Sequence, residues 1–208
     1  MWGFIIKGGP VMAPIILGSI IGLAIILEKL WNLNRLKIDT AAFAEEVFAN
    51  IKSNKIQKAL WLCDHHIEHP LAAVLKVGIE RRSSSSDRIE KMMEQTGNMQ
   101  VHRLEKRLGG LASIVGIEPL MGFLGTITGL IKAFMSWEAA GANITVSVLA
   151  LGIYEAMLTT AAGLIVAIPY YLCYNYFISR IKYISAEMNE YSTQLIDILA
   201  ESKQAEAK

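Results

Sequence analysis

Three long apolar stretches constrain this chain more than any other feature of its sequence. The first runs from Gly8 to Leu27 without a charged residue, and the second runs from Leu108 to Ile131 with Glu118 as its one interruption. The third lies within residues 139–179, where Glu155 is the single charged residue. Each exceeds the roughly 20 residues that an α-helix needs to cross a bilayer core of about 30 Å. The sequence therefore predicts three transmembrane helices.

The composition agrees with a membrane protein. Of the 208 residues, 53% are hydrophobic and 19% are charged, and the mean hydropathy is +0.37, which is too apolar for an ordinary soluble domain. Basic residues are spread along the chain, which argues against nucleic-acid binding. Cys63 and Cys173 belong to no CxxC pair, so neither a disulfide framework nor a zinc ribbon is indicated. We interpret the N-terminal stretch as a retained anchor, not a cleaved signal peptide.

The distribution of Lys and Arg predicts the topology. Basic residues follow the first span, precede the second and follow the third, whereas residues 136–147 between spans two and three contain none. By the positive-inside rule, the N-terminus is expected outside the membrane and the C-terminus in the cytoplasm. The expected order is N-terminal segment and transmembrane helix 1 (1–30), cytoplasmic helical domain (31–107), transmembrane helix 2 (108–137), external loop (138–146), transmembrane helix 3 (147–179), and cytoplasmic C-terminal helix and tail (180–208).

Apolar spacing predicts helices in the cytoplasmic parts. Residues 39–66 read as one helix that Pro70 ends, and residues 70–82 read as a second helix. After a serine-rich break, Asp87 with Glu90 suits a capping box. The helix over 88–108 is expected to continue into span two. Residues 183–199 predict an amphipathic helix.

The third span carries polar residues where lipid is expected. A carboxylate such as that of Glu155 costs about 2.5–3.5 kcal/mol in a span, so it usually faces protein or water. A structural hydrogen bond to another helix, or a place near the outer interface, would also explain it. Thr159 shares the face of Glu155, whereas Thr160 lies on a stripe of small residues with Ala156 and Gly163. Either hydroxyl could instead bond to its own helix.

The second span strengthens a functional interpretation. Gly125 and Gly129 form a GxxxG packing face, and Gly122 and Thr126 lie close to it in the sequence. Spans two and three run antiparallel, so Thr126 and Thr160, each about halfway along its span, reach a similar depth. Hydroxyls at mid-membrane can hold a short chain of water, as a proton or ion path requires.

At this point the sequence resembles the MotA/TolQ/ExbB proton-channel family, in its TolQ/ExbB branch. The stretches that carry the resemblance are "GFLGTITGLIKAF" and "GIYEAMLTTAAGLIVAIPYYLCYN". The matching positions are Gly122, Leu124, Gly125, Thr126 and Gly129, followed by Gly152, Ile153, Glu155, Ala156, Thr160, Gly163, Leu164, Ala167, Ile168, Pro169 and Asn175.

The resemblance implies a function and partners. It implies a bacterial inner-membrane subunit, without a cofactor, that forms a pentamer around a dimer of a single-span ExbD/TolR-type partner. That partner's membrane aspartate carries protons, and an envelope protein of TonB/TolA type can receive the work. Thr126 and Thr160 match pore-lining hydroxyls, Glu155 matches a glutamate above them, and Pro169 matches a proline that kinks the inner half of span three.

Some residues depart from the family pattern. Glu118 stands where a small or neutral residue is expected. It could be solvated, could pair with Lys106 or Arg107, or could gather protons at the channel exit. Tyr170 and Tyr171 are bulkier than expected and suit an interfacial belt.

A histidine cluster offers a different interpretation. "HHIEH" contains His65, His66, Glu68 and His69, an order that resembles an inverted zinc-protease motif. No convincing third protein ligand stands out, and histidines also suit the C-terminal end of a helix. Three hypotheses follow: a proton-driven motor subunit, which we favour; a structural membrane scaffold; and a metalloprotease.

Overall fold

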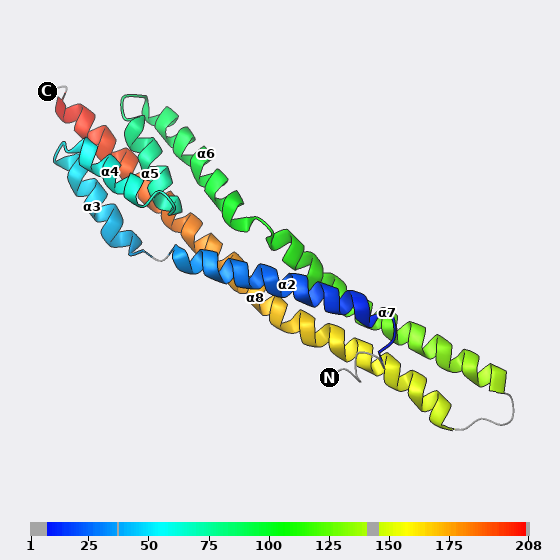
Figure 1. The fold of residues 1–208 in the computed structure, drawn as a ribbon. Helices are drawn as coiled ribbons and strands as arrows, with labels where there is room; N and C mark the ends of the chain where they lie inside the picture. The colour runs from blue at the N-terminus through cyan, green and yellow to red at the C-terminus, as the bar shows by residue number, and fades with distance from the viewer. Residues whose placement is uncertain (1–7, 37, 141–145, 207–208) are drawn as a thin grey trace. The chain divides into compact units, whose positions relative to one another are not determined.

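The computed structural model describes residues 8–36, 38–140 and 146–206. Within those ranges the regular structure is entirely helical, which confirms the predicted all-α fold. The helices are α2 (Met12–Arg35), α3 (Thr40–Lys52), α4 (Ile56–His65), α5 (Pro70–Glu80), α6 (Ser86–Glu105), α7 (Leu108–Ala140) and α8 (Val146–Glu206). Figure 1 shows their order along the chain.

The chain divides into two compact units. Unit 1 comprises residues 1–30 and 107–176, and unit 2 comprises residues 31–106 and 177–208. In unit 1, α7 and the first part of α8 pack against each other and against α2. Three helices in the described part of the chain, α2, α7 and α8, are long and apolar enough to cross a membrane, in agreement with the three predicted spans.

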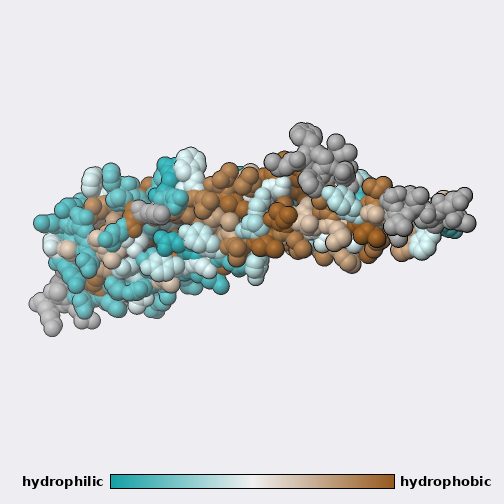
Figure 2. Space-filling model, turned by 90° about the horizontal axis from the view of Figure 1, so that it is seen from below, coloured by the Kyte–Doolittle hydropathy of each residue, from teal (hydrophilic) through white to brown (hydrophobic). Residues whose placement is uncertain are grey.

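Unit 1 presents large hydrophobic side chains on its outside. Leu17, Phe123, Ile165 and Leu172 are each more than 60% exposed. Figure 2 shows hydrophobic residues over the visible face of these helices, whereas hydrophilic residues predominate on the visible face of unit 2. Apolar surface of this extent suits contact with lipid or with another apolar helix.

Unit 2 has its own hydrophobic core. Its fully buried side chains include Val47, Cys63, Leu71, Leu75 and Leu195, from α3, α4, α5 and α8. A hydrogen bond from the Thr40 hydroxyl to Glu187 Oε1, 2.6 Å long, joins α3 to α8. Asp39 caps α3, because its carboxylate accepts from the backbone N–H of Ala42 at 3.1 Å.

The predicted single helix over residues 39–66 was wrong. It divides into α3 and α4 at Ser53–Lys55, where Asn54 has a φ of 57°. Asn tolerates this left-handed conformation better than most residues, and it ends α3 in the way helices commonly end. Pro70 is the first residue of α5, a position where its missing N–H costs nothing.

The start and the end of α6 also differ from the prediction. The N-cap is Ser85, and Asp87 lies inside the first turn, so the predicted capping box was wrong. The expected continuation into span two was wrong as well. The helix ends at Glu105 because Lys106 is extended and Arg107 has a φ of 69°. Arg107 is held there by an ion pair with Glu28 of α2.

Span three and the predicted helix over 183–199 are parts of one helix, α8. Within unit 2 its buried face includes Ile184, Met188, Leu195 and Leu199, which confirms the predicted amphipathic pattern. Pro169 lies inside α8, where it leaves the carbonyl of Ile165 without the usual helical donor. The membrane orientation and the predicted domain limits stay predictions.

Candidate functional site

Small residues bring α7 and α8 into close contact in unit 1. A Cβ atom added at Gly129 would lie 3.1 Å from the Cβ of Ala156, and one added at Gly122 would lie 3.0 Å from the Thr160 Cα. A Cβ at Gly125 would overlap the side chain of Thr159. These contacts pair later residues of α7 with earlier residues of α8, so the two helices are antiparallel. We call this contact the glycine seam.

Gly163 continues the glycine seam toward the start of α7. A Cβ added there would lie 2.5 Å from the carbonyl oxygen of Glu118 and 3.3 Å from the Cα of Gly122. Glycine allows this close approach because it has no Cβ. Pro169, which we also expected to be a helix-packing residue, is exposed within this chain, so its packing role stays a prediction.

Thr126 and Thr160 meet at the middle of the glycine seam. Their hydroxyls hydrogen-bond to each other. Thr126 Oγ1 also lies 3.1 Å from the Ala156 carbonyl, and Thr160 Oγ1 lies 3.1 Å from the Gly122 carbonyl. Both side chains are partly exposed. The structure thus brings together the two hydroxyls that the sequence placed at similar depth.

This geometry gives the hydroxyl pair two complete hydrogen-bond arrangements. In one, Thr126 donates to Thr160, and Thr160 donates to the Gly122 carbonyl. In the other, Thr160 donates to Thr126, and Thr126 donates to the Ala156 carbonyl. Each hydroxyl has one proton and two acceptor lone pairs, so either arrangement satisfies both groups. The pair can therefore reverse its direction without leaving a donor unpaired.

Thr159 has a different environment. Its side chain is fully buried, and its hydroxyl donates to the Ala156 carbonyl at 2.9 Å within its own helix. It also fills the space opposite Gly125. These contacts are those of a packing residue, and the bond to Ala156 is the kind of bond within its own helix that the sequence analysis kept as an alternative.

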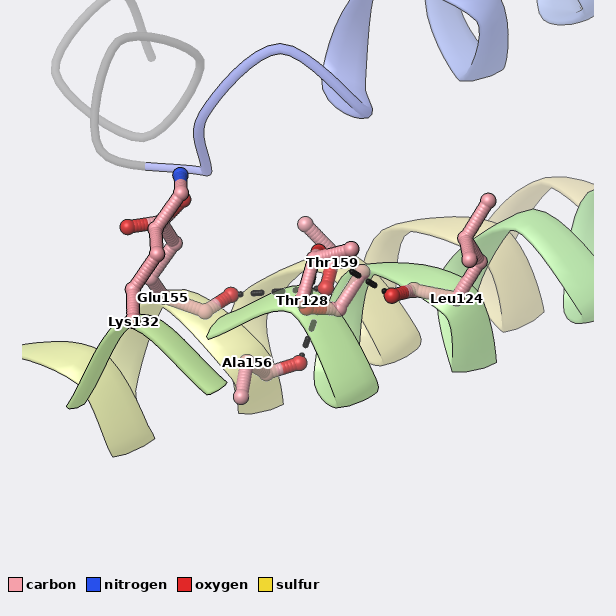
Figure 3. A network of polar contacts seen from close by, with 7 residues as sticks. Leu124, Thr128, Lys132, Glu155, Ala156 and Thr159 are labelled. Atoms are coloured by element: carbon pink, nitrogen blue, oxygen red, sulfur yellow. Dashed lines mark hydrogen bonds and ion pairs between the residues drawn. The ribbon is translucent and has the colours of Figure 1, made fainter. Parts of the chain in front are cut away.

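Glu155 is paired with a cation. Lys132 Nζ of α7 lies 2.9 Å from Glu155 Oε1, and the two side chains are 53% and 25% exposed respectively. Figure 3 shows the two side chains together, one helical turn from Thr159. The apolar helix α8 can hold a carboxylate at this point because Lys132 of α7 supplies the opposite charge.

Glu118 is buried, and one of its two expected cationic partners is engaged elsewhere. Its side chain is 3% exposed, so it is not solvated. Arg107, one of its two expected partners, pairs with Glu28. Among the described residues, Glu118 Oε2 has no hydrogen-bond partner. Its other carboxylate oxygen lies against Gly18 of α2, where a Cβ would overlap it.

Tyr170 is a helix-connecting residue that the sequence did not reveal. Its hydroxyl donates to the Ser19 carbonyl of α2 at 2.5 Å, and its ring occupies the space that a Cβ at Gly22 would need. The expected interfacial belt position of this residue stays a prediction. The small residues Gly18, Ser19 and Gly22 were the available signal, since they permit such an approach.

The histidines of unit 2 have structural contacts. His65 stacks on Trp61, with ring centroids 5.4 Å apart, and His66 meets the Phe43 ring edge-on. His69 is the N-cap of α5, where its Nδ1 accepts from the Leu71 N–H at 3.3 Å. In the described ranges, no three His, Cys, Asp or Glu side chains are placed to hold a metal ion.

Burial makes His69 a source of acid sensitivity. Desolvation lowers the pKa of its imidazole from 6.5 to about 4. The unfolded chain therefore takes up this proton first as the pH falls, and unit 2 is expected to lose about 2 kcal/mol between pH 6.5 and about pH 5. Hydrogen exchange at the amides of α5, corrected for intrinsic rates, measures this change.

The control is His69→Asn, since Asn also caps helices but does not titrate. This variant should keep the protection of α5 at neutral pH and lose most of the decrease at acidic pH. An equal decrease in both proteins would assign the acid sensitivity to another group.

The sequence of this chain is similar to that of a known protein family and of several of its members. The model of the MotA/TolQ/ExbB proton channel family matches residues 66–190, a range that includes the glycine seam, the hydroxyl pair, Glu118 and Glu155. The chain is 31% identical over 176 residues to an ExbB-like biopolymer transport protein of Synechocystis sp.. That match covers 84% of this chain and 69% of the relative.

Two further relatives match over shorter segments. The biopolymer transport protein ExbB of Salmonella typhimurium is 34% identical over 125 residues, or 55% of this chain and 49% of that protein. The Tol-Pal system protein TolQ of Haemophilus influenzae is 33% identical over 102 residues, or 49% of this chain and 44% of that protein. This chain thus spans less than half the length of each of these two relatives.

Proposed function

Because the chain belongs to the MotA/TolQ/ExbB proton channel family, we propose that it is the channel subunit of a motor that uses the proton-motive force to do work on the cell envelope. The motor works with a single-span partner of ExbD/TolR type, since the relatives carry the names ExbB and TolQ. The observation that carries the proposal is the hydroxyl pair of Thr126 and Thr160, which lies midway along α7 and in the apolar first part of α8.

The hydroxyl pair gives the partner's carboxyl group a polar contact inside the membrane. A protonated carboxyl can donate to a threonine, and a carboxylate can accept from one. Because the pair has two hydrogen-bond arrangements, it can serve either protonation state of the partner by reversing its direction. Each proton that moves down about 100 mV releases roughly 2.3 kcal/mol, so a motor combines several such steps.

The ion pair of Lys132 and Glu155 has a supporting role in this proposal. It lies about 9 Å along α7 from Thr126, at 1.5 Å per residue. Paired charges hold water near the outer end of the channel while leaving little net field on a proton that passes. We place this end on the periplasmic side, following the predicted topology.

The exposed hydrophobic side chains of unit 1 support an oligomer. In each of the three candidate spans, 22% of the most apolar 18-residue segment is buried within the chain. In the proposed ring of five copies, one part of this surface contacts neighbouring subunits and the rest contacts lipid. The ring surrounds a dimer of the partner and lies in the inner membrane, and an envelope protein of TonB/TolA type receives the work.

Proton uptake into vesicles distinguishes the motor subunit from the structural scaffold. Vesicles that contain the full chain and its partner, under a potassium diffusion potential, are expected to take up protons faster than vesicles with the chain alone. A pH-sensitive dye trapped inside reports the rate. Equal rates with and without the partner, in a complex that purification shows to be assembled, would favour the scaffold.

A further inference from the structure

Glu118 is a buried carboxyl group that the proposed function does not use. It is 3% exposed, and its Oε2 has no hydrogen-bond partner among the described residues. Three helices of unit 1 surround it. Its carboxylate lies against Gly18 of α2, and its backbone carbonyl lies against Gly163 of α8.

Among the residues that the structure describes, no ion pair joins Glu118 to a basic side chain. From α2, the facing residue is Gly18, and from α8 the ionisable group within electrostatic range is the hydroxyl of Tyr170. That hydroxyl already donates to the Ser19 carbonyl. Arg107, the residue immediately before α7, binds Glu28. A carboxylate anion in such a place is unfavourable, whereas a protonated carboxyl is tolerated.

Glu118 adds a third polar level to the region of the glycine seam. Along α7, Lys132 and Thr126 are about 9 Å apart, and Thr126 and Glu118 are about 12 Å apart. Unit 1 therefore has polar groups at three levels: the Lys132–Glu155 pair, the hydroxyl pair and Glu118. The carboxyl lies on the far side of the hydroxyl pair from the Lys132–Glu155 pair.

We propose that Glu118 is a proton-binding site of the channel subunit itself, which holds a proton between the hydroxyl pair and the Arg107 end of the span. Water delivers the proton to Oε2, where an O–H bond forms, and water removes it again when the carboxyl ionises. This proposal rests on the proposed function, because it assigns Glu118 to the same proton path.

Carbodiimide labelling tests whether Glu118 holds a proton. Dicyclohexylcarbodiimide reacts with protonated carboxyl groups in apolar surroundings, and mass spectrometry of peptides from the full chain in native membranes locates the label. Label is expected on Glu118 and is expected to decrease as the pH is raised. Glu28 and Glu155, each paired with a cation, are the internal controls and should label less.

Infrared spectroscopy gives a second measurement that does not depend on reagent access. The carbonyl stretch of a protonated carboxyl should be present in the wild type and absent from Glu118→Gln. If Glu118 neither labels nor gives this band at any pH, the proposal is overturned. If sodium ions suppress the label at constant pH, the site binds a metal cation, and the assignment to protons is overturned.

Proton uptake with the partner then tests the place of Glu118 in the path. Glu118→Gln is expected to reduce the rate about tenfold or more, and Glu118→Asp should retain part of it. The matched control is Ser113→Ala, an exposed position on α7. Uptake at the wild-type rate in a folded Glu118→Gln variant would overturn the proposal. Absence of uptake in the wild type would refute the proposed function instead, since labelling and the infrared band require no transport.

Discussion

Thr160→Val is expected to reduce partner-dependent proton uptake about tenfold or more while the protein still folds and assembles. Valine has nearly the shape of threonine, so the contact of α7 with α8 is retained, but it has no hydroxyl. The Gly122 carbonyl loses its contact with Thr160, and Thr126 loses its partner. Vesicle uptake with a trapped pH-sensitive dye measures the rate, and gel filtration measures assembly.

Thr126→Val should have a similar effect, because the hydroxyls act as a pair. For the same reason the double variant should lose little more than either single variant, in contrast to the additive effect of independent sites. Thr160→Ser, which keeps the hydroxyl, should retain much of the wild-type rate of proton uptake.

Thr128→Val is the matched control for these variants. Thr128 is in the same helix, and its hydroxyl donates to the carbonyls of Leu124 and Gly125 in that helix, as Figure 3 shows for Leu124. Its loss should change uptake by less than about twofold. If Thr128→Val and Thr160→Val lower the rate equally, the hydroxyl pair has no special role.

The second large effect is expected from one added methyl group in the glycine seam. In Gly163→Ala, the new Cβ would lie 2.5 Å from the Glu118 carbonyl oxygen, which is backbone and cannot turn aside. Overpacking of this kind costs about 1–3 kcal/mol. We expect the melting temperature of the detergent-solubilised protein to fall by about 3–10 °C, and proton uptake to fall with it as Thr160 moves from Thr126.

Gly116→Ala is the control, because it is expected to leave the melting temperature unchanged or to raise it. Gly116 is in α7 and a Cβ there meets nothing within 4 Å. Alanine is favoured over glycine in a helix interior by up to about 1 kcal/mol, so this variant should be as stable as the wild type or slightly more stable. If both substitutions lower the melting temperature by the same amount, the seam is not the cause.

The sequence predicted what depends on local composition. The three apolar stretches are long enough to identify the spanning helices without any tertiary information. The depth of Thr126 and Thr160 also follows from counting residues along two antiparallel spans. Their hydrogen bond, in contrast, depends on how closely the backbones approach, and only the structure gives that distance.

The predictions that were wrong depend on single backbone angles or on distant partners. Asn54 and Arg107 each adopt a positive φ, and no periodicity of apolar residues reveals such a point. Arg107 was expected to be available for Glu118, but it binds Glu28, 79 residues away in the sequence. Ion pairs of this range follow from the fold and cannot be read from neighbouring residues.

The acceptors of the hydroxyl pair have a consequence for genetics. In its two arrangements the pair donates either to the backbone carbonyl of Gly122 or to that of Ala156, and every residue carries such a carbonyl. A screen of point mutations would therefore recover the two donors through the loss of their hydroxyls, whereas substitutions at Gly122 and Ala156 would act through packing and would leave the carbonyl acceptors in place. The path of the backbone, and not any side chain, supplies the acceptors of these hydrogen bonds. The bonds are therefore kept only while the residues of the glycine seam hold α7 and α8 close together.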